Sequence, residues 1–240
     1  MNNPLHYKLE NTDPSERKAF IRDMFDDIVP TYDFLNRFLS AGIDRGWRRT
    51  VVRAATREEN PRVLDLCCGT GDLSKQLREK GANVTSLDFS TAMLQQGQSR
   101  GWLTKKTVAA DASHLPFQSE SFDRATIAFG IRNIPDLDNL MAETARVLKK
   151  GGTFQILELT RPKNFLVIPF YNLYLKVILP RVGALVSGKK MAYDYLAETI
   201  ATFVEPEELA AMLRERGFDE VKVKSKTFGI ATILTAKKGI

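Results

Sequence analysis

Short apolar segments alternate with longer amphipathic segments through the middle of the chain, and this alternation constrains the fold more than any other feature. The apolar segments have the length of buried strands, and the segments between them have the length and periodicity of helices. This order is typical of parallel βαβ units in a doubly wound sheet, and it predicts an α/β protein. The predicted strands are Arg62–Cys67, Asn83–Asp88, Lys105–Ala110, Phe122–Phe129 and Thr153–Leu159.

Helices are predicted between these strands, and their ends carry recognisable signals. Ser90 is a good N-cap for one of them, and Gly151 with Gly152 is predicted to end another. The connecting helices are Asp72–Lys80, the segment from Ser90 to Arg100, and Leu137–Lys149.

The flanks of this core differ from it, although nothing indicates a second domain. Residues 1–60 show no strand pattern and predict a helical cap before the core at 62–160, which is followed by an apolar insertion at 162–190 and a C-terminal part at 191–240. The cap helices are expected at Ser15–Ile28, broken by Pro30, at Tyr32–Leu39, and at Asp44–Ala55. The C-terminal part predicts helices Tyr193–Phe203 and Glu207–Arg216 and an edge hairpin of Glu220–Lys226 and Ile230–Lys237.

Composition narrows the class of protein further. The chain has 240 residues, 43% of them hydrophobic and 27% charged, which suits one folded domain. A net charge of +6 permits anionic partners, but no dense run of basic residues with interleaved aromatics is present, so a nucleic acid is not expected. The adjacent cysteines Cys67 and Cys68 favour buried, reduced thiols, and the N-terminus lacks a secretory pattern, so we expect a cytoplasmic protein.

The segment Val63–Leu73 has the pattern of a strand–turn–helix joint. An apolar run passes through the small residues Gly69, Thr70 and Gly71 before a helix begins. A joint of this kind places backbone N–H groups beside a nucleotide-like ligand at the carboxyl edge of a sheet.

Three acids, Asp65, Asp88 and Asp111, close three successive predicted strands. The carboxyl ends of parallel strands meet at one edge of the sheet, so these acids are expected at the same ligand-binding edge. Asp88 follows the Gly-rich turn by about twenty residues, the separation expected of a carboxylate that binds a ribose diol. Each acid alone has a second interpretation, as the cap of the next helix, but the set of three favours a ligand site.

Asp72 directly follows the turn, at the helix N-terminus where a dinucleotide would place its pyrophosphate. A carboxylate there is unfavourable for a pyrophosphate and acceptable for a cofactor that carries an ammonium and a sulfonium group. We therefore expect S-adenosylmethionine as the cofactor. Its expected contacts are Asp88 for the ribose, Asp111 and Ala112 for the adenine, and Asp65 and Thr70 for the cationic methionine end.

These residues also carry a resemblance to known proteins. Asp65 to Gly71 is similar to the first motif of class I S-adenosylmethionine-dependent methyltransferases, with Cys67 where that class usually has glycine. Longer blocks resemble the ubiquinone/menaquinone biosynthesis C-methyltransferase family, from about Lys18 onward: Tyr32–Ser40 with Asp44 and Trp47, Phe129–Asn133, and Arg146–Phe154 running on to Glu158. Cys67–Asp72 looks like the menaquinone branch. The departures are Asp44 in place of His, Lys150 in place of Pro or Glu, and Thr160 in place of Ser.

The resemblance implies a Rossmann-like methyltransferase fold with a seven-stranded, mostly parallel sheet. It also implies that the chain methylates a ring carbon of a polyprenyl quinol, such as demethylmenaquinol. We expect the mechanism to need no metal. The equivalent benzoquinol of ubiquinone biosynthesis, or another small hydrophobic acceptor, stays open as the substrate.

Two side chains are candidates for the chemistry on the acceptor. Arg132 follows a predicted strand end, where its guanidinium would stabilise the phenolate that develops on a quinol. The alternative for Arg132 is a salt bridge to Asp136 or Asp138. Tyr32, in the helical cap, would hydrogen-bond a quinol oxygen, and the alternative is ordinary packing.

The segment Phe165–Val186 is unusually apolar, yet it contains two prolines and two cations, so it does not predict a membrane span. We expect it to meet the polyprenyl tail of the substrate and to lie at a membrane surface, with Lys176, Arg181, Lys189 and Lys190 toward lipid head groups. A lid packed on the core, or a homodimer contact, is the alternative.

Two other functions compete with a quinol methyltransferase. A nucleotide-dependent dehydrogenase is disfavoured by Asp72 and by the missing third glycine of its fingerprint. A non-catalytic domain with the same fold is disfavoured because Asp65, Asp88, Asp111 and Arg132 are all present at matching strand ends.

Overall fold

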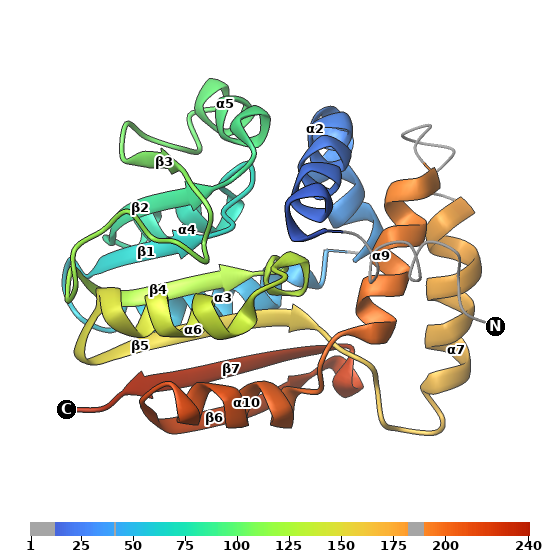
Figure 1. Cartoon of the computed structure of the whole chain (residues 1–240). Coiled ribbons are helices and arrows are strands. Elements are labelled where there is room, and N and C mark those ends of the chain that lie inside the picture. The colour runs from blue at the N-terminus through green and yellow to red at the C-terminus, as the bar shows by residue number, and fades with distance from the viewer. Residues whose placement is uncertain (1–12, 41, 182–189) are drawn as a thin grey trace.

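The computed structural model of the chain describes residues 13–40, 42–181 and 190–240, and a mixed sheet lies at its centre (Figure 1). The sheet has seven strands in the order β3-β2-β1-β4-β5-β7-β6. β1 to β5 pair in parallel, whereas β7 is antiparallel to both β5 and β6. The predicted mostly parallel sheet with an antiparallel edge hairpin is confirmed. The strands are β1 (Arg62–Leu66), β2 (Asn83–Asp88), β3 (Thr107–Ala109), β4 (Phe122–Ala128), β5 (Leu148–Leu159), β6 (Phe218–Lys226) and β7 (Ala231–Lys238).

Helices cover both faces of the sheet, and the alternation of side chains along β1 shows why (Figure 1). Val63 belongs to the core under α3 (Asp44–Ala55) and α4 (Asp72–Glu79). Leu64 and Leu66 belong to the opposite core, under α6 (Leu137–Val147) and α10 (Pro206–Glu215). Successive strand residues point to opposite faces, so an apolar run such as this one requires a layer of helices on each side.

A further helix, α5 (Thr91–Ser99), follows β2 and begins as predicted. The Ser90 hydroxyl accepts a hydrogen bond from the backbone N–H of Met93, so Ser90 is the N-cap.

The N-terminal helix α2 (Pro14–Leu39) continues through Pro30, so the predicted break at this residue is wrong. Proline inside a helix costs roughly 3 kcal/mol because it lacks an N–H and clashes with the preceding turn. The packing of α2 offsets this cost, since Ile21, Met24 and Ile28 are buried in a core shared with the C-terminal helices. The burial of α2 therefore outweighs the tendency of Pro30 to end a helix.

The predicted end of α6 at Gly151 and Gly152 is also wrong. The helix ends at Val147, and β5 begins at Leu148, so both glycines lie inside the strand. Leu148 pairs with Phe122 of β4, and the register shifts before the next pair, which marks a bulge. Gly151 adopts φ 72° there, a left-handed conformation that glycine takes without strain.

The apolar segment after β5 forms α7 (Ile168–Leu173) and a π-helical turn, η2 (Tyr174–Ile178), and α9 (Lys190–Thr202) lies beside it. One face packs against α2 and α9, which agrees with the alternative of a lid on the core. The opposite face is exposed, with Phe165 77% and Phe170 75% accessible. Within the described residues, no helix combines the length and hydropathy needed to cross a bilayer.

Candidate active site

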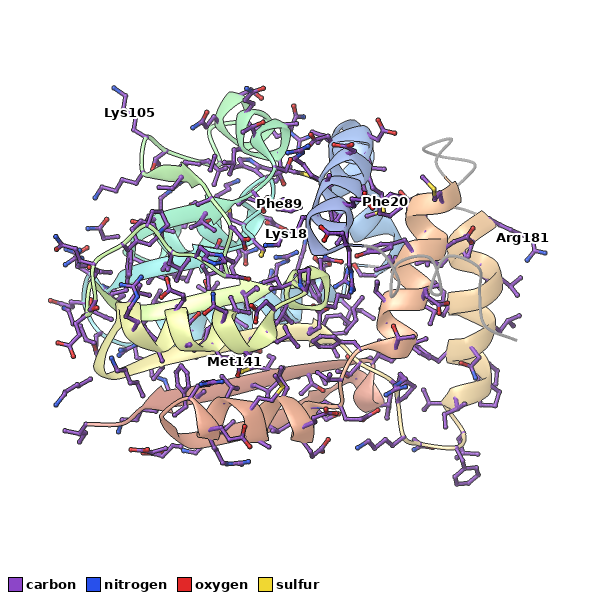
Figure 2. The ribbon with its side chains drawn as sticks, in the orientation of Figure 1. Lys18, Phe20, Phe89, Lys105, Met141 and Arg181 are labelled. Atoms are coloured by element: carbon purple, nitrogen blue, oxygen red, sulfur yellow. The ribbon has the colours of Figure 1, made fainter. Side chains whose placement is uncertain are left out.

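A cavity of about 320 Å³ lies at the carboxyl edge of the parallel strands, and we call it the sheet-edge cavity. The ends of β1, β2, β3 and β4 contribute to its wall, and the N-terminal half of α2 covers it. Figure 2 shows Lys18 and Phe89 between α2 and these strand ends. Its lining includes Lys18, Cys67, Phe89, Asp111, Ala112, Gly130 and Asn133.

The Gly-rich turn lies behind this cavity and is held by Asp88. One carboxylate oxygen of Asp88 accepts a hydrogen bond from the backbone N–H of Gly69 at 2.8 Å, and the other accepts one from Ser90 N–H at 2.9 Å. Gly71 has φ 89°, and a Cβ there would lie 2.4 Å from the Leu103 side chain. The turn therefore requires glycine at residue 71 and a carboxylate at residue 88.

Asp65 lies beneath the turn and is 1% exposed. It accepts hydrogen bonds from the hydroxyls of Ser74 at 2.5 Å and Thr126 at 2.8 Å. Burial raises the pKa of Asp65 to about 6, although these hydrogen bonds oppose the shift. Burial likewise raises the pKa of Asp88 to about 6.

Asp111 faces the sheet-edge cavity, and its charge is balanced by a residue of α2. Lys18 Nζ lies 2.5 Å from the carboxylate, which also accepts a hydrogen bond from Ser113 N–H at 2.8 Å. Partial burial opposes ionisation, but the hydrogen bonds and the ion pair outweigh it and hold the pKa of Asp111 below its ordinary value.

A second cavity, of about 400 Å³, lies beside the first, and we call it the apolar cavity. Helices α2, α3, α7 and α9 and the turn after β4 enclose it. Its wall is mainly aliphatic and aromatic, and polar groups occur at a few points. Four tyrosines of its lining come from the C-terminal helices and the π-helical turn: Tyr171, Tyr174, Tyr193 and Tyr195.

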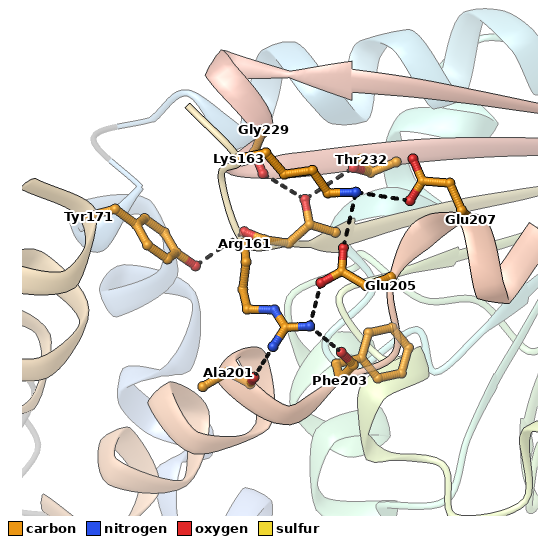
Figure 3. Close-up of polar contacts among 10 residues, drawn as sticks. Arg161, Lys163, Tyr171, Ala201, Phe203, Glu205, Glu207, Gly229 and Thr232 are labelled. Carbon is orange, nitrogen blue, oxygen red and sulfur yellow. Dashed lines mark hydrogen bonds and ion pairs between the residues drawn. The ribbon is translucent and has the colours of Figure 1, made fainter. Parts of the chain in front are cut away.

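The loop between β5 and α7 fixes this wall to the sheet (Figure 3). The Tyr171 hydroxyl donates to the backbone carbonyl of Thr160 at 3.2 Å. Arg161 donates to the backbone carbonyls of Ala201 and Phe203, at the end of α9, and to the carboxylate of Glu205, the residue before α10 (Pro206–Glu215). The apolar cavity is therefore closed by a segment that is tied to both β5 and α9.

Arg132 lines the apolar cavity, and its partner is Glu158. The Nη1 of Arg132 donates to Glu158 at 2.5 Å and to the backbone carbonyl of Phe129 at 2.8 Å. The side chains of Arg132 and Glu158 are 8% and 1% exposed. The Nε of Arg132 is buried and has no hydrogen-bond partner among the described residues, so one strong donor is left for a ligand.

The two cavities share a wall at the turn Phe129–Asn133. Phe129 and Arg132 line the apolar cavity, whereas Gly130 and Asn133 line the sheet-edge cavity. The Tyr195 hydroxyl donates to the Asn133 side chain at 3.1 Å and so joins the two sides. Phe129 has φ 62°, a strained conformation for a bulky residue, of the kind that collects at functional sites.

The predicted cofactor residues occupy two layers. Asp111 and Ala112 line the sheet-edge cavity. Among the described residues, the predicted contacts Asp65, Gly69, Thr70, Gly71 and Asp88 lie behind the cavity lining and not in it. Tyr32 lies on α2, and its side chain falls outside the described part of the structure.

Several expectations about charges need correction. The predicted alternative partners of Arg132 are engaged elsewhere, since Asp136 caps α6 through the N–H of Asn139 and Asp138 pairs with Arg216. Asp72 lies 3.6 Å from Arg48, so its charge is partly balanced and argues less strongly against a pyrophosphate than expected.

The two cysteines and the cations of the apolar segment were also assigned environments from the sequence. Cys67 and Cys68 are free thiols, but they are half-buried and not buried. Of the predicted head-group cations, the structure describes the side chain of Arg181, which projects from the molecule (Figure 2). Lys189 and the side chains of Lys176 and Lys190 lie outside the described residues.

Sequence reasoning assigned no role to Glu158, Asn133 or Tyr195. For Glu158 a signal existed, because it lies at the carboxyl end of β5 as the other acids lie at the ends of β1 and β2. Tyr195 has no such signal, since its contact with Asn133 joins segments 62 residues apart.

The sheet order and a ligand cavity at its carboxyl edge define a Rossmann-like methyltransferase fold. A putative methyltransferase of Haloferax volcanii, solved with its Trm112 activator, has a similar fold, with a TM-score of 0.62 and 20% identity over 90% of this chain and 98% of that one. A possible histamine N-methyltransferase of Thermotoga maritima matches with a TM-score of 0.61 and 19% identity over 90% and 99% of the two chains.

The family follows from the sequence relatives. The model of the ubiE/COQ5 methyltransferase family matches residues 11–238, and the chain belongs to this family. The ubiquinone/menaquinone biosynthesis C-methyltransferase UbiE of Geobacter sulfurreducens is 40% identical over 94% of this chain and 91% of its own length. The demethylmenaquinone methyltransferase of Thermus thermophilus is 42% identical over 88% and 97%. The chain is therefore a methyltransferase.

Proposed function

We propose that this chain transfers a methyl group from S-adenosylmethionine to a ring carbon of demethylmenaquinol and so forms menaquinol. The observation that carries the proposal is the pair of cavities across the turn Phe129–Asn133, one at the ligand edge of the sheet and one apolar. Relatives named demethylmenaquinone methyltransferase, 40–42% identical over most of the chain, support the same acceptor.

The residues around the sheet-edge cavity fit the cofactor. Its volume falls in the ordinary range of small-molecule sites. Asp88 accepts one backbone hydrogen bond on each oxygen, so lone pairs remain for a ribose diol. A Cβ at Gly130 would lie 2.5 Å from the Cβ of Cys67, so this wall has no room for a side chain. We assign the adenine to Asp111 and Ala112 in the lining and the ribose to Asp88, which lies behind it, with Asp65 supporting the turn from below.

When bound, S-adenosylmethionine supplies an electrophilic methyl group. A quinol carbon is a weak nucleophile until the neighbouring hydroxyl shares or loses its proton. Arg132 stabilises the oxygen charge that develops, because its guanidinium stays protonated and its Nε is directed to no other described group. Glu158 holds Arg132 in place, and the shared wall keeps the two reactants adjacent, which contributes through orientation. Tyr32 stays a candidate for a second contact to a quinol oxygen.

The exposed face of α7 supports a peripheral contact with the cytoplasmic face of the membrane, where a polyprenyl quinol resides. Phe170 and Leu173 on α7, with Phe165 and Leu166 in the turn before it, are 54–77% exposed, and such a patch marks an interaction surface. Flotation with anionic vesicles tests this contact. We expect wild-type protein to float and a Phe165→Ser, Phe170→Ser variant to stay behind. Dimerisation through this face is the alternative. If sedimentation shows that wild-type protein is a dimer and flotation shows no vesicle binding, we would assign this face to a dimer contact instead of a membrane contact.

A methyl-transfer assay tests the function itself. Purified protein is incubated without oxygen with methyl-labelled S-adenosylmethionine and either demethylmenaquinol or the corresponding demethylated benzoquinol. We expect label on the naphthoquinol ring. Labelling of the benzoquinol alone would assign the chain to the ubiquinone step, and no label on either ring would overturn the proposal.

A further inference from the structure

The apolar cavity contains a second buried ion pair besides Arg132 and Glu158. Asp44 and Arg48, one turn apart at the start of α3, both line the cavity, and their side chains are 6% and 10% exposed. The Arg48 guanidinium lies 4.9 Å from the centre of the Phe129 ring, and the carbonyl of Phe129 accepts the hydrogen bond from Arg132. The two ion pairs therefore approach the same residue, one through its ring and one through its backbone.

Asp44 is held in a fixed position by its neighbours. One carboxylate oxygen accepts a hydrogen bond from the Ser40 hydroxyl at 2.7 Å, and the other lies 3.5 Å from Arg48 Nε. The position at the first turn of a helix also favours its negative charge. An ionised carboxylate has about four lone-pair sites, so hydrogen-bond acceptors remain available at the wall of an otherwise apolar cavity.

A pairing with Arg48 alone does not explain why this carboxylate faces a cavity. Arg48 has a second carboxylate neighbour, Asp72, at 3.6 Å, and Asp72 is not among the described residues that line the apolar cavity. Asp44 and Asp72 therefore share the guanidinium of Arg48, but of these two acids only Asp44 lines the apolar cavity.

The chemistry of the acceptor gives a use to the lone pairs of Asp44 that no described residue occupies. A quinol carries two hydroxyls on opposite sides of the ring, and each donates a hydrogen bond. The oxidised quinone carries two carbonyls, which only accept. A carboxylate that only accepts therefore favours the quinol and repels the quinone.

We propose that Asp44 binds the quinol hydroxyl opposite the one at Arg132 and thereby selects the reduced ring over the oxidised one. This inference rests on the proposed function of the apolar cavity. It matters for turnover because a quinone ring lacks the electron density to attack a methyl group, so a bound quinone would block the site.

Binding measurements test the selection by Asp44. The probes are 1,4-dihydroxynaphthalene, its oxidised form 1,4-naphthoquinone, and 1,4-dimethoxynaphthalene, which has no hydroxyl to donate; all are titrated with S-adenosylhomocysteine present and oxygen absent. Wild-type protein should bind the dihydroxy probe roughly 10- to 100-fold more tightly than the other two. In Asp44→Asn the side-chain amide donates to a carbonyl, so the ratio of quinone to quinol affinity should rise by at least about tenfold.

Asp72→Asn is the matched control, because it removes the other carboxylate near Arg48 and should leave the ratio unchanged. The dimethoxy probe needs no variant, so the inference can be tested even if Asp44→Asn fails to fold. Equal wild-type affinity for all three probes, or an unchanged ratio in a folded Asp44→Asn protein, would overturn the inference while methyl transfer persists. Absence of both binding and methyl transfer in wild-type protein would instead overturn the proposed function.

Discussion

The sheet-edge cavity and the apolar cavity share a wall but are built in different ways. The sheet-edge cavity takes most of its residues from the ends of neighbouring strands, where Cys67, Asp111 and Gly130 follow β1, β3 and β4, and α2 covers it. The apolar cavity takes its residues from helices far apart in the sequence, so Met24, Trp47 and Tyr195 meet there only in the folded chain.

The two cavities also treat buried charge differently. Beneath the sheet edge, Asp65 is hydrogen-bonded by hydroxyls, and its pKa rises to about 6. At the apolar cavity, the carboxylates of Glu158 and Asp44 each contact an arginine that lines the cavity. We infer that a local, strand-end motif positions the methyl donor, while long-range packing selects the acceptor and places charge against it.

Removal of the Arg132 side chain should have the largest effect of the changes proposed here. The effect should fall on the reaction of the acceptor in the apolar cavity and not on the binding of the cofactor. Loss of an oxyanion-stabilising donor lowers kcat by roughly 10²- to 10³-fold, so we expect this loss in Arg132→Ala with little change in the affinity for S-adenosylmethionine. Steady-state kinetics and calorimetric titration measure the two quantities.

Arg124→Ala is the control for Arg132→Ala, because Arg124 is a largely covered arginine on β4 that pairs with Glu58. Arg132→Lys keeps the charge should the alanine variant prove unstable. Full turnover with normal cofactor binding in Arg132→Ala would contradict the role of Arg132.

The free energy of unfolding should depend on pH through Asp65, which lies beneath the turn at the sheet edge. Its pKa is about 6 in the folded chain and 3.8 ordinarily, so the folded state holds the proton more tightly. The stability that Asp65 contributes is therefore greatest below about pH 4 and falls by about 3 kcal/mol as the pH rises to about 6. The difference in unfolding free energy between wild type and Asp65→Asn, from denaturant titrations across this range, measures it.

Asp123 gives a control of the opposite sign. Partial burial opposes its ionisation, but Lys149 at 2.6 Å and the backbone N–H of Arg62 hold the pKa of Asp123 below its ordinary value. Its contribution should be present above its ordinary pKa and be lost on acidification. A pH-independent difference for Asp65→Asn would contradict the burial of an ionisable acid under the turn.

Gly130→Ala should have a smaller effect, on the cofactor side of the shared wall. The added Cβ would lie 2.5 Å from the Cβ of Cys67, and overpacking of this kind costs roughly 1–3 kcal/mol. We expect cofactor affinity to fall by about tenfold, and Cys67→Gly in the same chain to restore it, because the clashing atom is then absent and φ 49° at residue 67 suits glycine. Unchanged affinity in Gly130→Ala, or no rescue, would contradict the close contact.

The same contrast explains what the sequence could predict. The parallel strands, the Gly-rich turn, the acids at the strand ends and the cap at Ser90 follow from local spacing, and the structure has them. The break at Pro30 was predicted wrongly because the burial of α2 outweighs a local cost. The partner of Arg132 could not be chosen from nearby acids, since Glu158 reaches it across two paired strands. A specific contact between two residues that are far apart in the sequence leaves no periodic signal in the chain.

A crystal structure with S-adenosylhomocysteine and a demethylated naphthoquinol tests most directly whether the two cavities hold donor and acceptor. We expect the adenosyl group in the sheet-edge cavity beside Asp111 and Ala112, and the ring in the apolar cavity beside Arg132, with the methyl-accepting carbon facing the sulfur past the turn Phe129–Asn133. A ring bound in the sheet-edge cavity, or on the outer face of α7 away from Arg132, would contradict this division of the site.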